Sequence, residues 1–136
     1  MTYRTGWLLA AAVAGLSCGA PTDGCGCPPA VAAARLFGRV ETTSGTPVDK
    51  AMIFAYVANE SGCVRHTDAD GVGETAPDGS YGFDLVYPDS GSICVLVAFR
   101  TPTGSSLTSS PDQSVTLAFR FSGRPDSARA DAIFTE

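Results

Sequence analysis

From Arg35 onward, the chain alternates apolar and polar residues over short runs and shows no sustained helical periodicity. A period of two places successive side chains on opposite faces of a β-strand, and clusters of Gly, Pro, Ser, Asn and Asp between the runs are typical of turns. The predicted strands are 36–40, 51–58, a short one near 73–75, 80–86, 92–101, 115–121 and 130–135. About seven strands in roughly a hundred residues predict an all-β, antiparallel β-sandwich.

The alternation also predicts which side chains are buried. In 92–101 the residues expected on one buried face are Ile93, Val95, Val97 and Phe99. In 115–121 they are Val115, Leu117, Phe119 and Phe121. Arg120 and Asp84 are expected to point outward. The 51–58 run is apolar on both faces, so we expect it to be a central strand.

The first seventeen residues have the organisation of an export signal. Arg4 supplies a positive charge, and the apolar run 6–16 follows it. As a helix rising about 1.5 Å per residue, this run spans only about 16 Å, too short for a bilayer core of about 30 Å. We therefore expect 1–17 to be a signal peptide that is removed on export, with a buried N-terminal helix as the alternative. The chain's single Trp, Trp7, lies in this segment.

The sequence Leu16-Ser17-Cys18-Gly19 is similar to the lipobox of bacterial lipoproteins, in which a Cys after a small residue is acylated and becomes the new N-terminus. Gly15 stands where the lipobox usually has leucine. Five Cys in an exported chain leave one unpaired, and acylation of Cys18 leaves an even four. We expect a lipid on Cys18, and attachment to the outer membrane because the next residue is not the Asp that favours inner-membrane retention. Ordinary signal cleavage is the alternative.

Composition divides the remaining chain into a tether at 18–34 and a domain at 35–136. The tether is dense in Gly and Pro and holds few large apolar groups, as flexible linkers do. The whole chain has 9 basic and 14 acidic side chains, a net charge of −5 and no run of Lys or Arg. Nucleic-acid binding needs a basic surface, so nucleic acid is not an expected partner.

Cys63 and Cys94 are the predicted disulfide pair. Export places the chain in an oxidising compartment. Cys63 follows the second predicted strand and Cys94 lies near the start of a long one, so antiparallel neighbours can bring their Cα atoms within about 4.4–6.8 Å. Four Cys allow three pairings, and a bridge from Cys25 or Cys27 to one of these two residues remains open.

Three ordered strings between residues 38 and 99 carry a family resemblance. They are GRV…GTPVDKAMI at 38–53, TAPDGSYGF at 75–83 and CVLVAF at 94–99. They resemble the G-x-V…G-x-P-V-x-x-A-x-I, T-x-x-D-G-x-Y-x-F and V-x-V-x-A elements of carboxypeptidase regulatory-like domains. This resemblance implies a transthyretin-like, or prealbumin-like, β-sandwich of about seven strands, and it implies no particular activity, because such domains accompany many unrelated partners.

Each candidate catalytic or metal site in the sequence lacks some of the residues that its chemistry needs. His66 lies near Asp68 and Asp70, but a catalytic zinc needs three protein ligands, and the calcium-loop pattern lacks its later ligands, so we interpret 66–71 as a solvated turn. Hydroxyisourate hydrolases, which share the transthyretin-like fold, need several His and a C-terminal Tyr-Arg-Gly-Ser that this chain lacks. The string ETAPDGSY at 74–81 also resembles adhesin repeats with a Lys–Asn crosslink, but the single Lys is Lys50, which is not in the first predicted strand.

The sequence therefore predicts a non-catalytic, lipid-anchored β-sandwich module of the bacterial envelope, with a structural or binding role and no metal or cofactor. Its expected partners are the membrane, through the lipid, and an envelope protein or carbohydrate. The alternative is a ligand-binding or accessory lipoprotein that serves a separately encoded enzyme or transporter. An unrecognised hydrolase is the third possibility, and it requires polar side chains that converge on a pocket.

Overall fold

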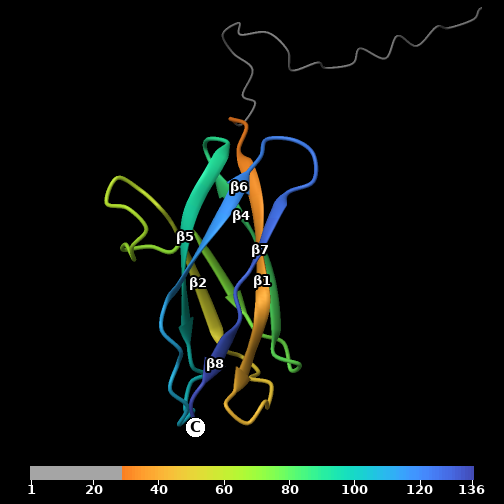
Figure 1. The fold of residues 1–136 in the computed structure, drawn as a ribbon, viewed down its shortest axis with the longest axis vertical. Helices are drawn as coiled ribbons and strands as arrows, with labels where there is room; N and C mark the ends of the chain where they lie inside the picture. The colour runs from red at the N-terminus through yellow and green to blue at the C-terminus, as the bar shows by residue number, and fades with distance from the viewer. Residues whose placement is uncertain (1–28) are drawn as a thin grey trace, which may run out of the picture.

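The computed structural model describes residues 29–136, which form eight β-strands and no helix (Figure 1). The strands are β1 (Ala32–Thr42), β2 (Met52–Val57), β3 (Gly71–Glu74), β4 (Ser80–Tyr87), β5 (Gly91–Arg100), β6 (Gln113–Phe119), β7 (Asp126–Arg129) and β8 (Ala132–Phe134). No helix long and apolar enough to cross a membrane occurs within these residues. The prediction of an all-β fold is confirmed.

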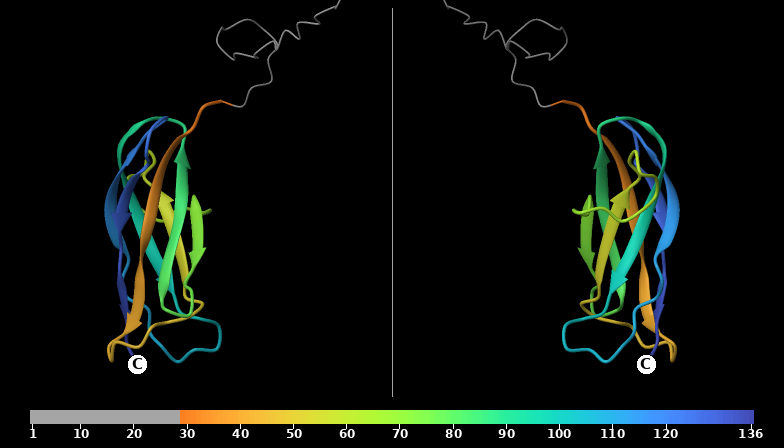
Figure 2. Two further views of the ribbon diagram at one scale, coloured as in Figure 1. Left: turned by 90° about the vertical axis from the view of Figure 1, so that its right-hand side faces the viewer. Right: turned by 90° about the vertical axis from the view of Figure 1, so that its left-hand side faces the viewer.

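The strands form two sheets that face each other (Figure 2). One sheet has the order β4-β1-β7, with β8 also paired to β1, and the other has the order β3-β2-β5-β6. The buried side chains come from both sheets and form one core, in which Leu36, Phe119 and Phe134 are among the largest fully buried groups. The position of β2 between β3 and β5 confirms that the 51–58 run is a central strand.

The prediction of purely antiparallel pairing is wrong at one edge. Both β7 and β8 pair with β1 in parallel, β7 against residues 34–37 and β8 against residues 40–42. They follow each other along the same side of β1, so the C-terminal segment forms one interrupted edge strand (Figure 1). Only β8 falls within the predicted 130–135 strand, and β7 was missed because its four residues, DSAR, hold a single small apolar residue.

The first strand starts earlier than predicted. The predicted strand 36–40 lies inside β1, which begins at Ala32. Ala32 and Ala34 are fully buried, and Ala32–Ala34 pair with β4, so these residues belong to the sheet and not to the tether predicted at 18–34. Small alanine side chains fill this end of the core, and their Ala-Ala-Ala run carries no alternation that marks a strand.

The predicted faces of the long strands are confirmed except at one residue. Val97 and Phe119 are buried, with 0% and 1% of their surface exposed, while Asp84 and Arg120 are exposed. Phe121 was expected to be buried and is 51% exposed. Because β6 ends at Phe119 and the chain turns away toward β7, Phe121 lies in the connecting loop instead of on the strand.

Candidate functional site

The interruption between β7 and β8 forms a partly open depression of about 250 Å³ on the outer surface of the first sheet. Its lining is mostly charged and comprises Arg39, Glu41, Arg129, Asp131, Ala132 and Ile133. Arg39 and Glu41 point outward from β1 because outward and inward residues alternate along that strand. Asp131 lies in the interruption itself, between Arg129 at the end of β7 and Ala132 at the start of β8.

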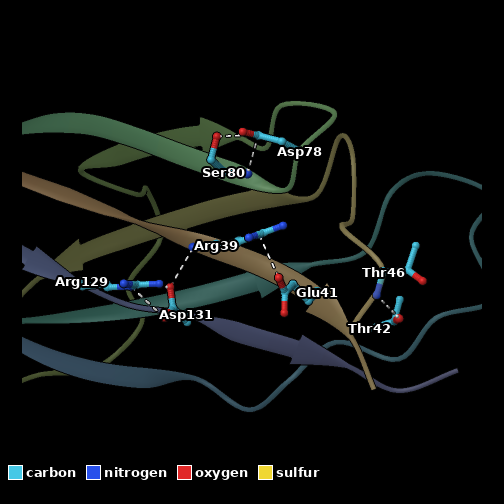
Figure 3. Close-up of polar contacts among 8 residues, drawn as sticks. All are labelled: Arg39, Glu41, Thr42, Thr46, Asp78, Ser80, Arg129 and Asp131. Atoms are coloured by element: carbon cyan, nitrogen blue, oxygen red, sulfur yellow. Dashed lines mark hydrogen bonds and ion pairs between the residues drawn. The ribbon is translucent and has the colours of Figure 1, made fainter. Parts of the chain in front are cut away.

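Asp131 joins the charged groups of this depression (Figure 3). Its Oδ1 accepts a hydrogen bond from the backbone N–H of Arg39 at 2.8 Å, and the Nε of Arg129 lies 2.8 Å from its Oδ2. The Asp131 carbonyl accepts a hydrogen bond from Gln113 Nε2 at 2.6 Å. The Asp131 carboxylate therefore replaces the partner that β1 loses where the edge strand is interrupted.

The other charges of the depression are also paired. Arg39 Nε lies 2.8 Å from Glu41 Oε1, and these side chains are 47% and 35% exposed. The hydrogen bond from Arg129 to Asp131 raises the pKa of the arginine. The depression offers alternating positive and negative groups to a polar partner, but within residues 29–136 its lining contains no nucleophile beside a base.

A second set of contacts, on the core side of the first sheet, holds the chain in place at the β7–β8 interruption. Tyr81 on β4 is buried, and its hydroxyl donates a hydrogen bond to the Ala130 carbonyl at 2.6 Å. The Ala130 N–H donates in turn to the Phe37 carbonyl at 2.9 Å. Any side chain at Gly38 would clash with the Ala130 carbonyl and the Tyr81 ring, so a glycine is needed here. Burial raises the pKa of Tyr81, which keeps its hydroxyl a donor well above neutral pH.

The predicted disulfide between Cys63 and Cys94 is present, with the two Cα atoms 5.8 Å apart. It attaches the 59–70 loop to β5 on the outer surface of the second sheet (Figure 2). Arg65 extends the attachment beyond β5, because its Nε donates to Asp112 Oδ2 at 2.7 Å and its Nη2 donates to Asp112 Oδ1. The hydrogen bond to Asp112 raises the pKa of Arg65.

Of the candidate residues His66, Asp68 and Asp70, the structure brings His66 and Asp70 together. His66 Nε2 lies 3.2 Å from Asp70 Oδ2 and 3.3 Å from the Val57 carbonyl, and its ring packs edge-on against Tyr56. The Asp70 carboxylate accepts the Val57 N–H at 2.7 Å, so it anchors the loop to β2. Among residues 29–136, no three His, Cys, Asp or Glu side chains lie close enough together to hold a metal ion.

The ETAPDGSY string forms a turn that joins β3 to β4. Thr75 is buried, and its hydroxyl donates to the Val48 carbonyl at 2.6 Å and accepts the Ala51 N–H at 2.9 Å. Asp78 Oδ1 accepts hydrogen bonds from the hydroxyl and the N–H of Ser80, which lower the pKa of its carboxyl. Gly79 has a φ of 79°, a conformation that favours glycine. These contacts give the string a structural role.

The distance between Lys50 and Asn59 is too large for the Lys–Asn crosslink. Lys50 precedes β2, and the single Asn of the chain, Asn59, follows it. A strand rises about 3.3 Å per residue, so the six residues of β2 alone separate these side chains by roughly 20 Å. They lie at opposite ends of the second sheet.

Sequence reasoning missed Asp131 and the Arg65–Asp112 pair. These partners are far apart in the chain, 92 residues for Arg39 with Asp131 and 47 for Arg65 with Asp112. No local pattern marks such pairs, because each depends on which strands become neighbours. The predicted lipidation site, Cys18, and the alternative disulfide partners, Cys25 and Cys27, lie outside the described residues.

Comparison with known proteins gives no family assignment. No family model matches the sequence, and a search of curated proteins gives no match. Among solved structures, the fold is similar to the dioxygenase domain of a dioxygenase carbohydrate-binding protein fusion from the cellulolytic bacterium Streptomyces sp. SirexAA-E. The similarity has a TM-score of 0.44 and 15% sequence identity, and covers 75% of this chain and 79% of that one.

Proposed function

We propose that this chain is a non-catalytic, lipid-anchored β-sandwich module of the bacterial envelope, related in fold to the transthyretin-like, carboxypeptidase regulatory-like domains. The observation that carries the proposal is the Cys63–Cys94 disulfide, because such bonds persist in oxidising compartments outside the cytoplasm. It agrees with the export signal at 1–17 and the lipobox-like Cys18. The two facing sheets, together with the GRV and TAPDGSYGF strings, support the family resemblance.

The described surface supports a binding or structural role in preference to catalysis. The arginines and carboxylates of the depression at the β7–β8 interruption are already paired with each other. Paired surface charges suit the rim of a protein or carbohydrate contact, where they fix orientation and contribute modestly to affinity. The alternative role, an accessory subunit of an envelope enzyme or transporter, uses this same depression as its contact surface.

Cell fractionation with a matched variant tests the anchoring. The wild-type chain and the Cys18→Ser variant are expressed in a bacterium that exports and acylates lipoproteins, and each is followed through separation of membranes from periplasm. We expect the wild-type chain in the outer-membrane fraction and the Cys18→Ser variant in the soluble periplasm or uncleaved. Recovery of the wild-type chain in the soluble periplasm would contradict the anchor, and recovery from the cytoplasm would contradict export.

Affinity capture separates the module from the accessory alternative. The acylated protein is captured from its own membranes after mild crosslinking, in parallel with an Arg39→Glu/Arg129→Glu double variant that reverses the positive charges of the depression. One stoichiometric envelope partner that is lost with the double variant favours the accessory role. A partner retained by the double variant assigns the contact to another surface.

A further inference from the structure

We propose that the end of the sandwich at which β1 begins docks on the surface of an anionic phospholipid membrane. This end comprises residues 29–31, the segment 86–90 at the end of β4 and in the turn after it, and the 120–125 loop, and it is called the β1-start end below. The inference deepens the proposed function and rests on it, because the lipid on Cys18 holds this end near the bilayer. It adds a direct protein–lipid contact to the covalent anchor.

The first argument is the clustering of exposed apolar groups. Val31, Val86 and Phe121 are 49%, 56% and 51% exposed, and all three belong to the β1-start end. Ala33 pairs with Val86 on β4 and with Arg120 next to Phe121, so β1, the end of β4 and the 120–125 loop are adjacent. Figure 1 shows the 120–125 loop beside the start of β1. Several half-exposed apolar side chains at one end of a molecule are typical of a surface that contacts a membrane or another protein.

The second argument is charge. The 120–125 loop, RFSGRP, holds two arginines and no acid. Arg120 and Arg124 form no ion pair with any carboxylate of residues 29–136, whereas Arg35, Arg39, Arg65 and Arg129 do. Asp89 and Asp126 also lie at this end, so its formal charges balance, and what favours anionic lipid is the position of the two arginines and not a net positive charge. Asp126 Oδ2 accepts a hydrogen bond from the Ala118 N–H at 3.0 Å. Arg120 and Arg124 stand on either side of the exposed Phe121, and guanidinium groups in this position suit anionic lipid headgroups.

The third argument is reach. Ten residues, 19–28, lie between Cys18 and the first described residue. Even fully extended, they span at most about 33–36 Å. The anchor therefore keeps the β1-start end within about 33–36 Å of the bilayer. At this distance a contact with the lipid becomes effectively intramolecular, so it can form even where it is too weak to recruit a free protein. Two or three acyl chains supply the stable attachment, and Phe121 with its arginines sets the orientation.

The opposite end of the molecule provides the control. Ile133 is 61% exposed, more than any apolar group of the β1-start end, but it pairs with Glu41 and lines the depression, whose arginines already pair with Glu41 and Asp131. It is the one large apolar residue of β8 that points outward. If exposure alone were enough for membrane contact, Ile133 would show it as strongly as Phe121.

Tryptophan fluorescence tests the orientation directly, because the mature chain contains no Trp once residues 1–17 are removed. Phe121→Trp and Ile133→Trp variants are purified in acylated form and inserted in vesicles of phosphatidylethanolamine and phosphatidylglycerol that contain brominated lipid. We expect a blue-shifted emission and quenching by at least about half for Phe121→Trp. For Ile133→Trp we expect no quenching and the emission maximum of a tryptophan that is exposed to water. Equal quenching of the two variants, or none in either, overturns the docking.

Two further measurements separate the docking from the anchor. Flotation of the same vesicles shows whether each variant is anchored: anchored protein with an unquenched Phe121→Trp signal refutes the docking and leaves the proposed function standing. Protein that does not float and carries no lipid refutes the proposed function, and the docking with it. Arg120→Ser/Arg124→Ser in the Phe121→Trp background is expected to reduce quenching at least about twofold, and unchanged quenching overturns the electrostatic part.

Discussion

Asp131 connects the interrupted edge strand of the first sheet to β1. The chain leaves β1 after Arg129 and returns to it at Ala132, and the aspartate carboxylate occupies the position between them. An Asp in this place accepts a backbone N–H from one strand and pairs with a guanidinium from the next. Such a charged acceptor is worth more than a neutral one, but partial exposure lets water replace part of it.

We expect Asp131→Ala to lower the free energy of unfolding by about 1–2 kcal/mol, because the Arg39 N–H loses its acceptor and Arg129 its partner. Asp84→Ala is the matched control, since Asp84 is 61% exposed and pairs only with the Arg35 side chain, so its loss costs about 0–1 kcal/mol. Urea unfolding at pH 7 measures both. Equal losses for the two variants would show that Asp131 is an ordinary surface charge.

Tyr81 gives a pH-dependent prediction at the same scale. Burial raises the pKa of its hydroxyl in the folded state above the unfolded value of 10.0, so its contribution to stability is complete below pH 10 and decreases as the pH rises above 10. Tyr81→Phe removes the hydrogen bond to Ala130 and is expected to cost about 1–2 kcal/mol at pH 7.

The same substitution removes a group that ionises in the unfolded chain. The stability difference between wild type and Tyr81→Phe is therefore expected to shrink between pH 7 and pH 11, as urea unfolding at the two values will show. The other tyrosines are common to both proteins and cancel in the difference. A constant or growing difference contradicts the assignment of Tyr81 as a buried neutral donor.

At the scale of elements, the disulfide holds the 59–70 loop against the second sheet. The cysteines are separated by 31 residues, for which chain entropy gives roughly 3–4 kcal/mol as an upper expectation. We expect the Cys63→Ala/Cys94→Ala variant to lose about that much stability in urea, and Cys25→Ala/Cys27→Ala, which keeps the bridge, to lose little. A larger loss for the second variant would indicate that the tether cysteines take part in the bridging.

The alternation along β6 makes a second prediction at this scale. Phe119 is 1% exposed and fills the core, so Phe119→Ala is expected to cost about 3–5 kcal/mol. Arg120, one residue further, is exposed and is expected to cost at most about 0.5 kcal/mol as Arg120→Ala. Similar losses in urea unfolding would contradict the register of this strand.

Strand positions could be predicted where alternation is strong, and less well where it is absent. The 92–101 and 80–86 predictions match β5 and β4 to within one residue at each end, because large apolar side chains mark one face of each strand. β7 and the start of β1 were missed because DSAR and AAA carry no such marks. The parallel edge and the Asp131 network depend on which strands become neighbours, and spacing along one chain does not determine that.

The whole molecule has two different ends. The β1-start end gathers exposed apolar groups and unpaired arginines, and the end that carries the C-terminus includes Glu136, whose hydrogen bonds to Ser44 and Thr42 lower the pKa of its carboxyl. This difference between the two ends suits a module that is held by its first strand. The depression lies at the β7–β8 interruption, beside β1, and Figure 3 shows its charged residues. This orientation depends on an anchor before residue 29.

Mass spectrometry of the mature N-terminus shows whether Cys18 carries the lipid anchor. The protein is isolated from its own membranes with detergent, digested, and the N-terminal peptide is identified by its mass. We expect this peptide to begin at Cys18 and to carry a diacylglyceryl group, with or without an additional N-acyl chain. A peptide that begins at an unmodified Cys18, at Pro21 or at Met1 would contradict the account.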